Sequence, residues 1–288
     1  MTGFPASLKK IAFLSALFFY FILPAIGQEQ PYYFAMITDT QFGMHTGNKG
    51  FDQETANYEF AVATINRLKP EFVIILGDLV NQEGDMDQIH EFLRVSRKID
   101  PFIPVYYVAG NHDVGAVPTP QLLDAYRETF GKDYYSFREG PIYGIVLNSS
   151  LMVAPQMVED EYKAQLSWLK GELEAARQSD ARQIIVFQHH PYFMKEANED
   201  DSYGNVPLER RQAVLELLHS YDIQHVFAGH VHSHSVGKDG NLDMVMVGPV
   251  AMPFGPNGSG IMLAAVTDEG IEYRYYGFGK LPNQLTTK

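Results

Sequence analysis

Eight short runs of apolar, β-branched and aromatic residues recur along the chain. Their length and composition are typical of β-strands, and several are apolar throughout, as in strands that are buried on both faces of a sheet. The runs lie at residues 32–38, 72–76, 105–109, 142–148, 184–188, 225–229, 243–248 and 261–267.

Between these runs, apolar residues recur at the spacing of a helix in five segments. Thr119 followed by Pro120 suits the N-cap and the first position of one such helix. The five segments are 55–68, 85–98, 119–130, 160–178 and 207–219.

The order of these elements predicts the fold class. Helices and strands alternate in the first part of the chain, and strands dominate the last part, which indicates an α/β fold with sheets inside and helices outside. The sequence has no internal repeat, no low-complexity tract and no Pro/Ser-rich linker, so a single domain is expected. We predict a four-layer α/β/β/α sandwich of two mixed sheets flanked by helices.

The N-terminal residues form a pattern of their own. Two lysines precede thirteen largely apolar residues, 11–23, and small residues follow before Gln28. This pattern is typical of a cleaved export signal. The alternative is a transmembrane anchor, which needs about twenty apolar residues. We therefore predict a signal peptide at residues 1–27, one domain at residues 28–288, and export to the periplasm or out of the cell.

The predicted mature chain is acidic. The full chain has a formal charge of −13, and removal of residues 1–27 takes away two of its 22 basic residues and none of its 35 acidic ones, which leaves −15. Such a surface repels nucleic acid and anionic membranes, so we expect no nucleic-acid partner and no stable membrane association after cleavage. The chain has no cysteine, so its stability must come from the core or from bound metal.

Polar residues with metal-binding or acid/base chemistry follow five of the predicted strands. In α/β sheets, ligands bind beyond the carboxyl ends of the strands, so we expect these residues to converge in one crevice. They are Asp39 and Gln41 after the first strand, Asp78 after the second, Asn111, His112 and Asp113 after the third, His189 and His190 after the fifth, and His230 and His232 after the sixth.

The residue types and their spacing suit a site for two metal ions. Asp39 and Gln41 are two positions apart, so on a strand they point to the same side and can hold one ion together. A glycine directly before Asp78, Asn111 and His230 lets the backbone approach the metals closely. One carboxylate, that of Asp78, can bridge two cations.

Two such ions polarise a phosphoryl group and lower the pKa of a bridging water. His112, next to the predicted ligand Asn111, is then free to donate a proton or a hydrogen bond to a phosphate oxygen. Each motif alone is a weak signal, because a Gly-Asp pair after a strand is usually only a turn. Their occurrence together, each after an apolar strand, favours a catalytic site.

The series of motifs resembles the calcineurin-like metallophosphoesterase superfamily, whose motifs are D-x-H, G-D-x-x-D/N, G-N-H-D/E, a strand-end His and G-H-x-H. In this chain they stand at residues 39–41, 77–81, 110–113, His189 and 229–232. The segments "GNHDVGAVPT", "FGKDYYSF" and "VFQHHP" look like the calcineurin-like phosphoesterase domain-containing protein group, whose eukaryotic members are called complete Ser/Thr protein phosphatases.

The resemblance implies roles for individual residues. His112 would be the proton donor, and His190 would pack or line the cleft, with the alternative that it replaces His189 as a ligand. The implied first metal is held by Asp39, Gln41, Asp78 and His232, and the second by Asp78, Asn111, His189 and His230.

Two residues depart from the superfamily pattern. Gln41 offers a neutral amide oxygen where the family has an imidazole, so the first site should favour Mn, Mg or Fe over Zn, although the identity of the two divalent ions stays open. Asn81 stands where some members have an aspartate that pairs with the catalytic histidine. Asp39 or Asp113 could supply that negative charge instead.

The resulting functional hypothesis is a metal-dependent phosphoesterase with its metallophosphoesterase domain at residues 28–288. It would hydrolyse phosphomonoesters of small molecules or of protein serine and threonine, by attack of a metal-bound hydroxide. The alternatives are a phosphodiesterase on the same site and a non-catalytic phosphate-binding shell with a weakened first metal site. The acidic segment 195–205 is either a mobile lid at the site or a solvated loop.

Overall fold

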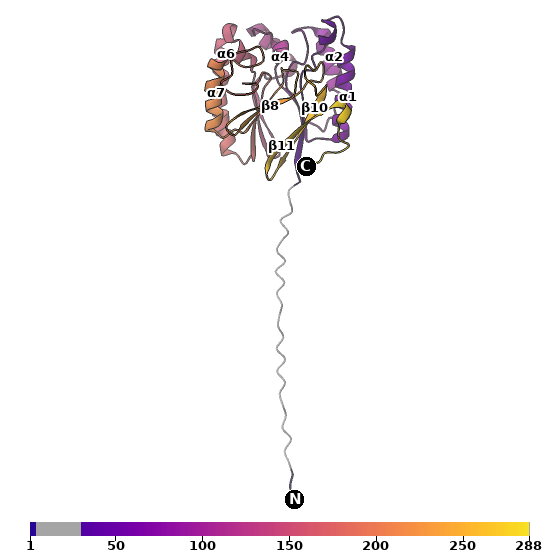
Figure 1. The fold of residues 1–288 in the computed structure, drawn as a ribbon, viewed down its shortest axis with the longest axis vertical. Helices are drawn as coiled ribbons and strands as arrows, with labels where there is room; N and C mark the ends of the chain where they lie inside the picture. The colour runs from indigo at the N-terminus through magenta and orange to yellow at the C-terminus, as the bar shows by residue number, and fades with distance from the viewer. Residues whose placement is uncertain (4–29, 288) are drawn as a thin grey trace.

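Two mixed β-sheets form the centre of the fold, and helices cover the outer face of each (Figure 1). In this computed structural model, residues 1–3 and 30–287 are described, so the predicted signal peptide lies, from residue 4 onward, outside the described residues. The first sheet has the strand order β11 (Gly270–Gly277), β10 (Gly260–Thr267), β1 (Tyr32–Ile37), β2 (Phe72–Ile75) and β3 (Val105–Tyr107). The second has the order β4 (Tyr135–Glu139), β5 (Ile142–Val146), β6 (Gln183–Phe187), β7 (His225–Ala228), β9 (Leu242–Met246) and β8 (Ser235–Asp239).

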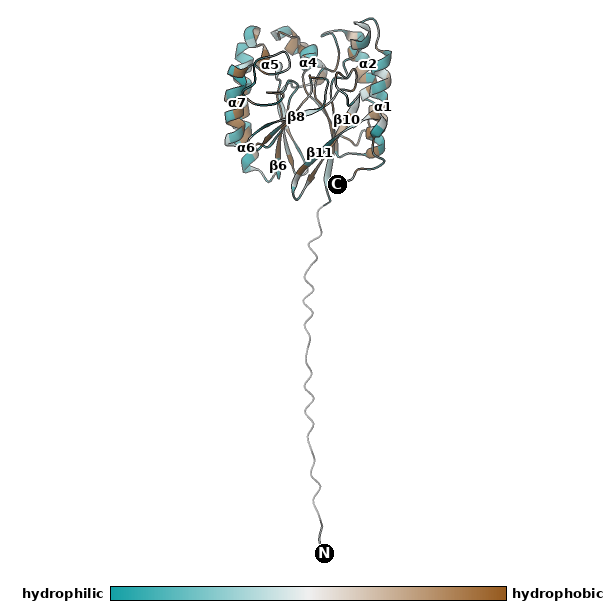
Figure 2. Ribbon diagram, in the orientation of Figure 1, coloured by the Kyte–Doolittle hydropathy of each residue, from teal (hydrophilic) through white to brown (hydrophobic). Residues whose placement is uncertain are grey.

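Four long helices form the two outer layers. In Figure 1, α1 (Asp52–Leu68) and α2 (Met86–Ser96) lie outside the first sheet, and α6 (Glu159–Gln178) and α7 (Leu208–Ser220) lie outside the second. Figure 2 shows that polar residues dominate the solvent side of these helices. The shorter helices are α3 (Asn111–Val114), α4 (Pro120–Phe130) and α5 (Ser150–Val153), with 3₁₀ turns η1 (Met44–Thr46), η2 (Pro155–Met157) and η3 (Phe278–Lys280).

The side chains of β1 show why the sandwich has four layers. Ala35 and Ile37 belong to the core between the first sheet and its helices. Phe34 and Met36, which alternate with them, belong to the core between the two sheets. Because successive side chains of a strand point to opposite faces, one apolar strand supplies two separate cores.

Aromatic side chains fill the space between the sheets. Phe34 stacks on Phe72 in the neighbouring strand, with ring centroids 4.9 Å apart. From the opposite sheet, Phe187 and Phe227 meet the ring of Phe34 edge-on, at 6.3 Å and 6.4 Å. All four rings are fully buried, so this cluster fixes the two sheets against each other.

The predicted architecture is confirmed, and each of the eight predicted strands and five predicted helices corresponds to an observed element. Three strands were not predicted: β4, β8 and β11. All three lie at the edges of their sheets, where a strand is half exposed and carries polar residues, as in the sequence "SVGKD" of β8. The apolar pattern that identifies central strands is therefore weak in them.

The strand directions place five loops at one end of the sandwich. β1, β2 and β3 run parallel to one another, as do β6 and β7. The loops after these strands, which carry the predicted ligands, therefore lie at the carboxyl ends of both sheets.

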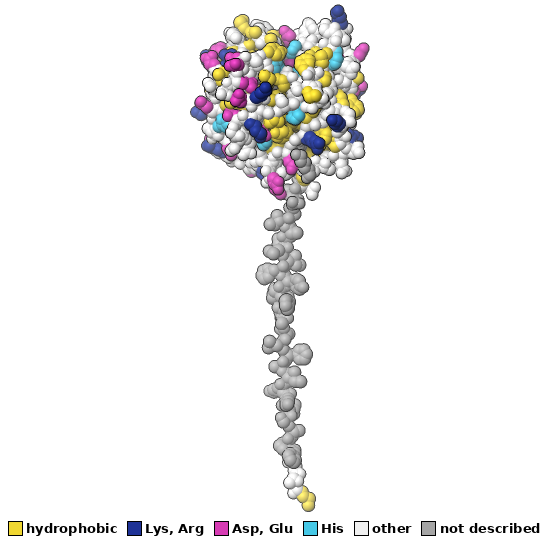
Figure 3. All heavy atoms as spheres, in the orientation of Figure 1, with side chains coloured by type: hydrophobic (Ala, Val, Ile, Leu, Met, Phe, Trp, Pro, Cys, Tyr) yellow, Lys and Arg dark blue, Asp and Glu magenta, His cyan; other side chains and the backbone are white. Residues whose placement is uncertain are grey.

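The described surface is mixed in character. On the face shown in Figure 3, acidic, basic and apolar side chains are interspersed. Among the helices that the structure describes, none is long and apolar enough to cross a membrane.

Candidate metal centre

The loops after five strands bring the predicted ligands of both sheets together. Asp78, His189 and His230 each offer one ligand atom, and these atoms all lie within 4.8 Å of one another. His232 Nε2 lies 3.4 Å from Asp39 Oδ1. Since Asp39 and Asp78 follow strands of the first sheet and the histidines follow strands of the second, the site spans the interface between the sheets.

Gln41 and Asn111 belong to the same network of loops. The Gln41 N–H donates to the carbonyl oxygen of Asp78 at 2.9 Å. The N–H of His112, which directly follows Asn111, donates to Oδ1 of Asp78 at 2.9 Å. The Asp78 loop is therefore bonded to both neighbouring ligand loops.

Five predicted ligands hold an uncommon backbone conformation. Asp39, Gln41, Asp78, His230 and His232 have positive φ angles of 50°, 36°, 51°, 70° and 51°. A residue with a side chain rarely adopts this left-handed region, which costs about 1–3 kcal/mol for each residue. Strain of this kind persists where the surrounding structure imposes it, as is typical of functional sites.

The expected strand geometry of Asp39 and Gln41 is wrong. We expected the two side chains to share one side of a strand because they are two positions apart. β1 ends at Ile37, so both residues lie in the loop beyond the strand. Their left-handed backbone conformation, and not strand alternation, sets the direction of their side chains.

Two glycines let these loops pack without space for a side chain. A Cβ atom at Gly110 would lie 2.2 Å from both the backbone nitrogen and Oδ1 of Asp78. A Cβ atom at Gly229 would lie 1.9 Å from Oγ1 of Thr38. Gly110 has an ordinary φ of −103°, so close contact and not conformational freedom requires glycine there.

Main-chain carbonyl groups fix the orientation of the ligand histidines. His189 Nδ1 lies 2.8 Å from the carbonyl oxygen of Leu76, and His232 Nδ1 lies 2.6 Å from that of Met252. A carbonyl oxygen only accepts, so each Nδ1 carries the proton of this bond. A ring held in this way has Nε2 as its remaining ligand atom, as in metal ligands held by a second hydrogen bond.

His230 is held in the reverse orientation. Its Nε2 lies 2.8 Å from the carbonyl oxygen of Tyr203 and donates to it. The ring is therefore left with the lone pair of Nδ1 as its donor to a cation.

Three buried oxygen atoms of the predicted ligands have no hydrogen-bond partner among the described residues: Asp39 Oδ1, Gln41 Oε1 and Asn111 Oδ1. An unprotonated His189 Nε2 also has none, and it lies 3.1 Å from Asp78 Oδ2, with which it pairs only when it carries a proton. An unpaired buried polar atom costs about 1–3 kcal/mol, and nearly all buried polar atoms have partners. Carboxylate, amide and imidazole donors are suitable ligands for divalent cations. The residues present therefore fit the divalent metal ions that this kind of site requires.

The charges of the site shift the pKa of its side chains. Burial alone would lower the pKa of His189, but the carboxylate of Asp78, 3.1 Å from Nε2, raises it to about 9. Burial opposes ionisation of Asp78, yet the neighbouring imidazoles hold its pKa below the usual range. Burial and the charge of His189 lower the pKa of His230 to about 4. Burial also raises the pKa of Asp39, against the effect of nearby imidazoles.

His112 is partly exposed, whereas the seven predicted ligands are buried. Its Nδ1 lies 2.7 Å from the backbone carbonyl oxygen of Asn81. The Asn81 side chain, which stands where some superfamily members have an aspartate, donates instead to Asn48 Oδ1 at 2.7 Å. The main chain, and not a carboxylate, orients the ring of His112.

Asp113, a candidate charged partner for His112, accepts hydrogen bonds from backbone N–H groups instead. Its Oδ1 accepts the N–H of Leu79 at 2.9 Å, and its Oδ2 accepts the N–H of Gly110 at 2.8 Å. Burial and the nearby Asp78 carboxylate raise the pKa of Asp113 to about 8. Asp113 thus joins the loops after β2 and β3.

His190 packs beside the predicted ligands. Its ring centroid lies 4.3 Å from that of His230, and its Nδ1 lies 2.9 Å from Ser149 Oγ. Burial lowers the pKa of His190, so the ring is neutral. Asn148, which follows β5, donates to Asp133 Oδ2 at 2.9 Å and so holds its own loop.

Three residues at the site were not predicted individually, although Tyr203 lies in the acidic segment 195–205 that the sequence singled out. Thr38 Oγ1 donates to Asp39 Oδ2 at 2.8 Å. The rings of Tyr203 and Phe254 lie against two of the ligand histidines. Both aromatic residues lie in loops outside the motifs, so motif spacing could not reveal them.

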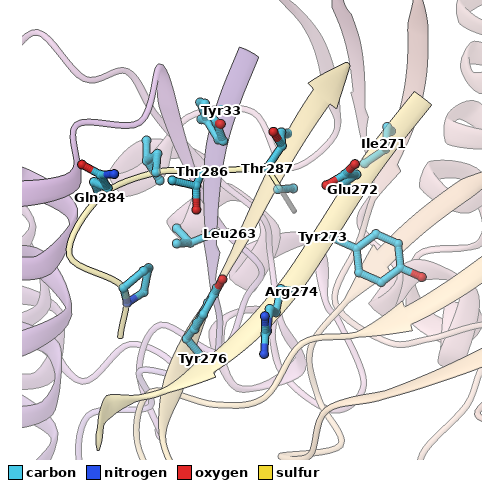
Figure 4. Close-up of a pocket in the computed structure, with 14 residues that line it drawn as sticks. Tyr33, Leu263, Ile271, Glu272, Tyr273, Arg274, Tyr276, Gln284, Thr286 and Thr287 are labelled. Carbon is cyan, nitrogen blue, oxygen red and sulfur yellow. The ribbon is translucent and has the colours of Figure 1, made fainter. Parts of the chain in front are cut away.

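A cavity of about 440 Å³ lies elsewhere in the fold (Figure 4). It is lined by Tyr33 near the start of β1, by residues such as Glu272 in β11 and by the C-terminal residues Gln284 to Thr287. Asp39 follows the opposite end of β1, so this cavity is separate from the predicted metal centre.

Comparison with known proteins identifies the family of this chain. The sequence profile described as calcineurin-like phosphoesterase matches residues 32–234. The serine/threonine-protein phosphatase CPPED1 of Mus musculus is 36% identical over 266 residues, which cover 87% of this chain and 85% of the relative. The human protein of the same name is 34% identical over 267 residues, with the same coverage. A probable cyclic nucleotide phosphodiesterase of Colwellia psychrerythraea is 26% identical, over 80% of each chain.

Solved structures share the fold. A dimetal phosphatase from Danio rerio superimposes with a TM-score of 0.64 at 18% identity, covering 86% of this chain and 97% of the other.

The close contact at Gly110 generates a prediction. Gly110→Ala would push the backbone of Asp78 away, so we expect the affinity for Mn²⁺ to fall by about tenfold to a hundredfold. Gly171→Ala is the matched control, because within the described structure no atom lies within 4 Å of a Cβ built at this helical position. Calorimetric titration with Mn²⁺ measures both, and wild-type affinity in Gly110→Ala would contradict the proposed packing.

Proposed function

Because the chain belongs to the calcineurin-like phosphoesterase family, we propose that it hydrolyses phosphomonoesters at a centre of two divalent cations. Family membership makes it a metal-dependent phosphoric ester hydrolase. The ester class and the number of cations are the proposed part. They are supported above all by unpaired buried oxygen atoms on Asp39, Gln41 and Asn111, among the described residues, beside the cluster of Asp78, His189 and His230.

The proposed ligands would divide between two cations, and Asp78 would serve both. Bound divalent cations polarise the phosphoryl group and lower the pKa of coordinated water. The neutral amide of Gln41 favours Mn, Mg or Fe over Zn in the first position. The first cation would be held by Asp39, Gln41, Asp78 and His232, and the second by Asp78, Asn111, His189 and His230.

His112 supplies the donor for the reacting phosphate. Its Nδ1 donates to the Asn81 carbonyl oxygen, so Nε2, on the far side of the ring, points away from that bond. When Nε2 carries a proton, it donates to a phosphate oxygen or to the leaving oxygen as negative charge develops there. Donation therefore requires the doubly protonated ring.

The relatives support a phosphomonoester substrate. The proteins from mouse and human are named serine/threonine-protein phosphatases, so phosphoserine and phosphothreonine are candidate substrates of this chain. The relative named a probable cyclic nucleotide phosphodiesterase favours diesters as the second candidate.

Hydrolysis of p-nitrophenyl phosphate and of bis-p-nitrophenyl phosphate distinguishes the two candidates. With Mn²⁺, we expect the monoester to be the better substrate in kcat/KM, by about tenfold or more, because a monoester presents three non-bridging oxygens and more negative charge to the donors of the site, whereas a diester presents two. Dominant diester turnover would overturn the proposal. Protein that holds less than one metal ion after saturation with Mn²⁺ would instead support a non-catalytic phosphate-binding shell.

The role of His112 is tested by His112→Ala. Removal of an acid catalyst should lower kcat by about a hundredfold or more, and the metal content should be unchanged because the ring is not a proposed ligand. The exposed His90 on α2 provides the control substitution His90→Ala. Turnover that survives in His112→Ala would place the donor elsewhere.

We also propose export, on the basis of the charged, apolar and small-residue pattern of residues 1–27. Intact-mass analysis of fractionated cells should find a mature chain that begins at Gln28 in the periplasm or the medium. Recovery of the full-length chain from the cytosolic fraction alone would contradict export. An exported enzyme would act on a broader set of phosphate esters than an intracellular signalling phosphatase.

A further inference from the structure

Two exposed aromatic rings lie directly against the proposed metal ligands. The ring of Tyr203 is tilted over His230, with centroids 4.8 Å apart. The ring of Phe254 stacks on His232 at 4.6 Å, with an interplanar angle of 16°. Tyr203 is 76% exposed and Phe254 is 67% exposed, so each residue contacts a predicted ligand and is also open to solvent.

Main-chain hydrogen bonds hold both residues at these positions. The carbonyl oxygen of Tyr203 accepts a hydrogen bond from His230 Nε2 at 2.8 Å. The N–H of Phe254 donates to the carbonyl oxygen of His232 at 2.8 Å. Since both bonds use backbone atoms, the position of each residue is tied to a ligand independently of its ring.

The loop that carries Tyr203 is fixed internally. Glu199 accepts the N–H of Met194 at 2.8 Å and the side-chain amide of Asn205 at 2.8 Å. The fully buried Arg211 donates to the carbonyl oxygens of Ala197 and Val206, each at 2.9 Å. These contacts favour a fixed wall beside the site over a mobile lid.

We propose that Tyr203 and Phe254 form a subsite for the planar aromatic leaving group of a phosphomonoester. The inference rests on the proposed function and adds the class of leaving group to it. The ligands are buried and the two rings lie between them and solvent, so a leaving group that extends outward from a bound phosphate meets the open faces of the rings. Aromatic groups stack on such faces more favourably than saturated groups of equal size.

The negative charge of the loop that carries Tyr203 restricts the class of leaving group further. Residues 196 and 199–201 are acidic, and Asp200 and Asp201 are exposed. A leaving group with further phosphates or carboxylates would be repelled there, so an uncharged aryl group is favoured.

Phenyl phosphate and cyclohexyl phosphate provide the test, because their leaving groups have equal carbon numbers and differ in planarity. In the metal-loaded wild type, we expect a lower KM for phenyl phosphate. Tyr203→Ala and Phe254→Ala should each raise that KM by about fivefold to tenfold and change the KM for cyclohexyl phosphate by less than about twofold. In Phe254→Ala the metal content should be unchanged, since the main-chain bond to His232 remains. Tyr203→Ala also removes a hydroxyl that hydrogen-bonds the Asn111 side chain, so its KM values are compared after saturation with metal.

Binding without turnover gives an independent measurement. Calorimetric titration with phenylphosphonate and cyclohexylphosphonate, neither of which has an ester bond to hydrolyse, should show the same selective loss of affinity for the aromatic compound. Tyr203→Phe keeps the ring and removes only the hydroxyl that hydrogen-bonds the Asn111 side chain, so it should keep the preference for the aromatic compound. Phe102→Ala removes a 92% exposed ring in the loop before β3 and serves as the matched control.

If Tyr203→Ala and Phe254→Ala change the KM for both compounds equally, or change neither, the subsite is wrong. Normal turnover in these variants would leave the proposed function intact. Absence of metal-dependent turnover of either phosphate by the wild type would overturn the proposed function, and this inference with it.

Discussion

The contact between the two sheets determines whether a metal centre can exist in this chain. Asp39, Asp78 and Asn111 follow strands of one sheet, whereas His189 and His230 follow strands of the other. No single sheet holds a complete set of the proposed ligands. The buried aromatic rings between the sheets hold them at a fixed separation, so packing far below the site sets the distance between carboxylates and imidazoles.

Between the two packed sheets, backbone conformation and backbone hydrogen bonds do most of the positioning of the proposed ligands. The left-handed conformations of five proposed ligands cost about 1–3 kcal/mol each, and hydrogen bonds between the loops and the close contact at Gly110 maintain them. The ligand histidines are oriented by main-chain carbonyl groups. A site built in this way is rigid before a cation binds, which reduces the ordering cost of binding.

Much of this arrangement could be predicted from the sequence, for identifiable reasons. Central strands such as β2 are apolar throughout, and ligands such as Asp78 follow them directly, so both fold class and candidate ligands were accessible. The edge strand β8 was missed because polar residues mask its pattern. Contacts between distant loops, such as Tyr203 with His230, depend on the three-dimensional path of the chain and have no local signature. The direction of Asp39 was misjudged because a left-handed turn replaces the expected strand.

The bond between His112 and the carbonyl oxygen of Asn81 has a consequence for how such enzymes are classified and engineered. Every amino acid has a carbonyl oxygen, so no point mutation at position 81 can delete this acceptor. The side chain of residue 81 is therefore not needed to orient the His112 ring. A motif search that demands an aspartate there would reject a competent enzyme, and a mutational scan that finds position 81 tolerant would not show that His112 lacks a partner.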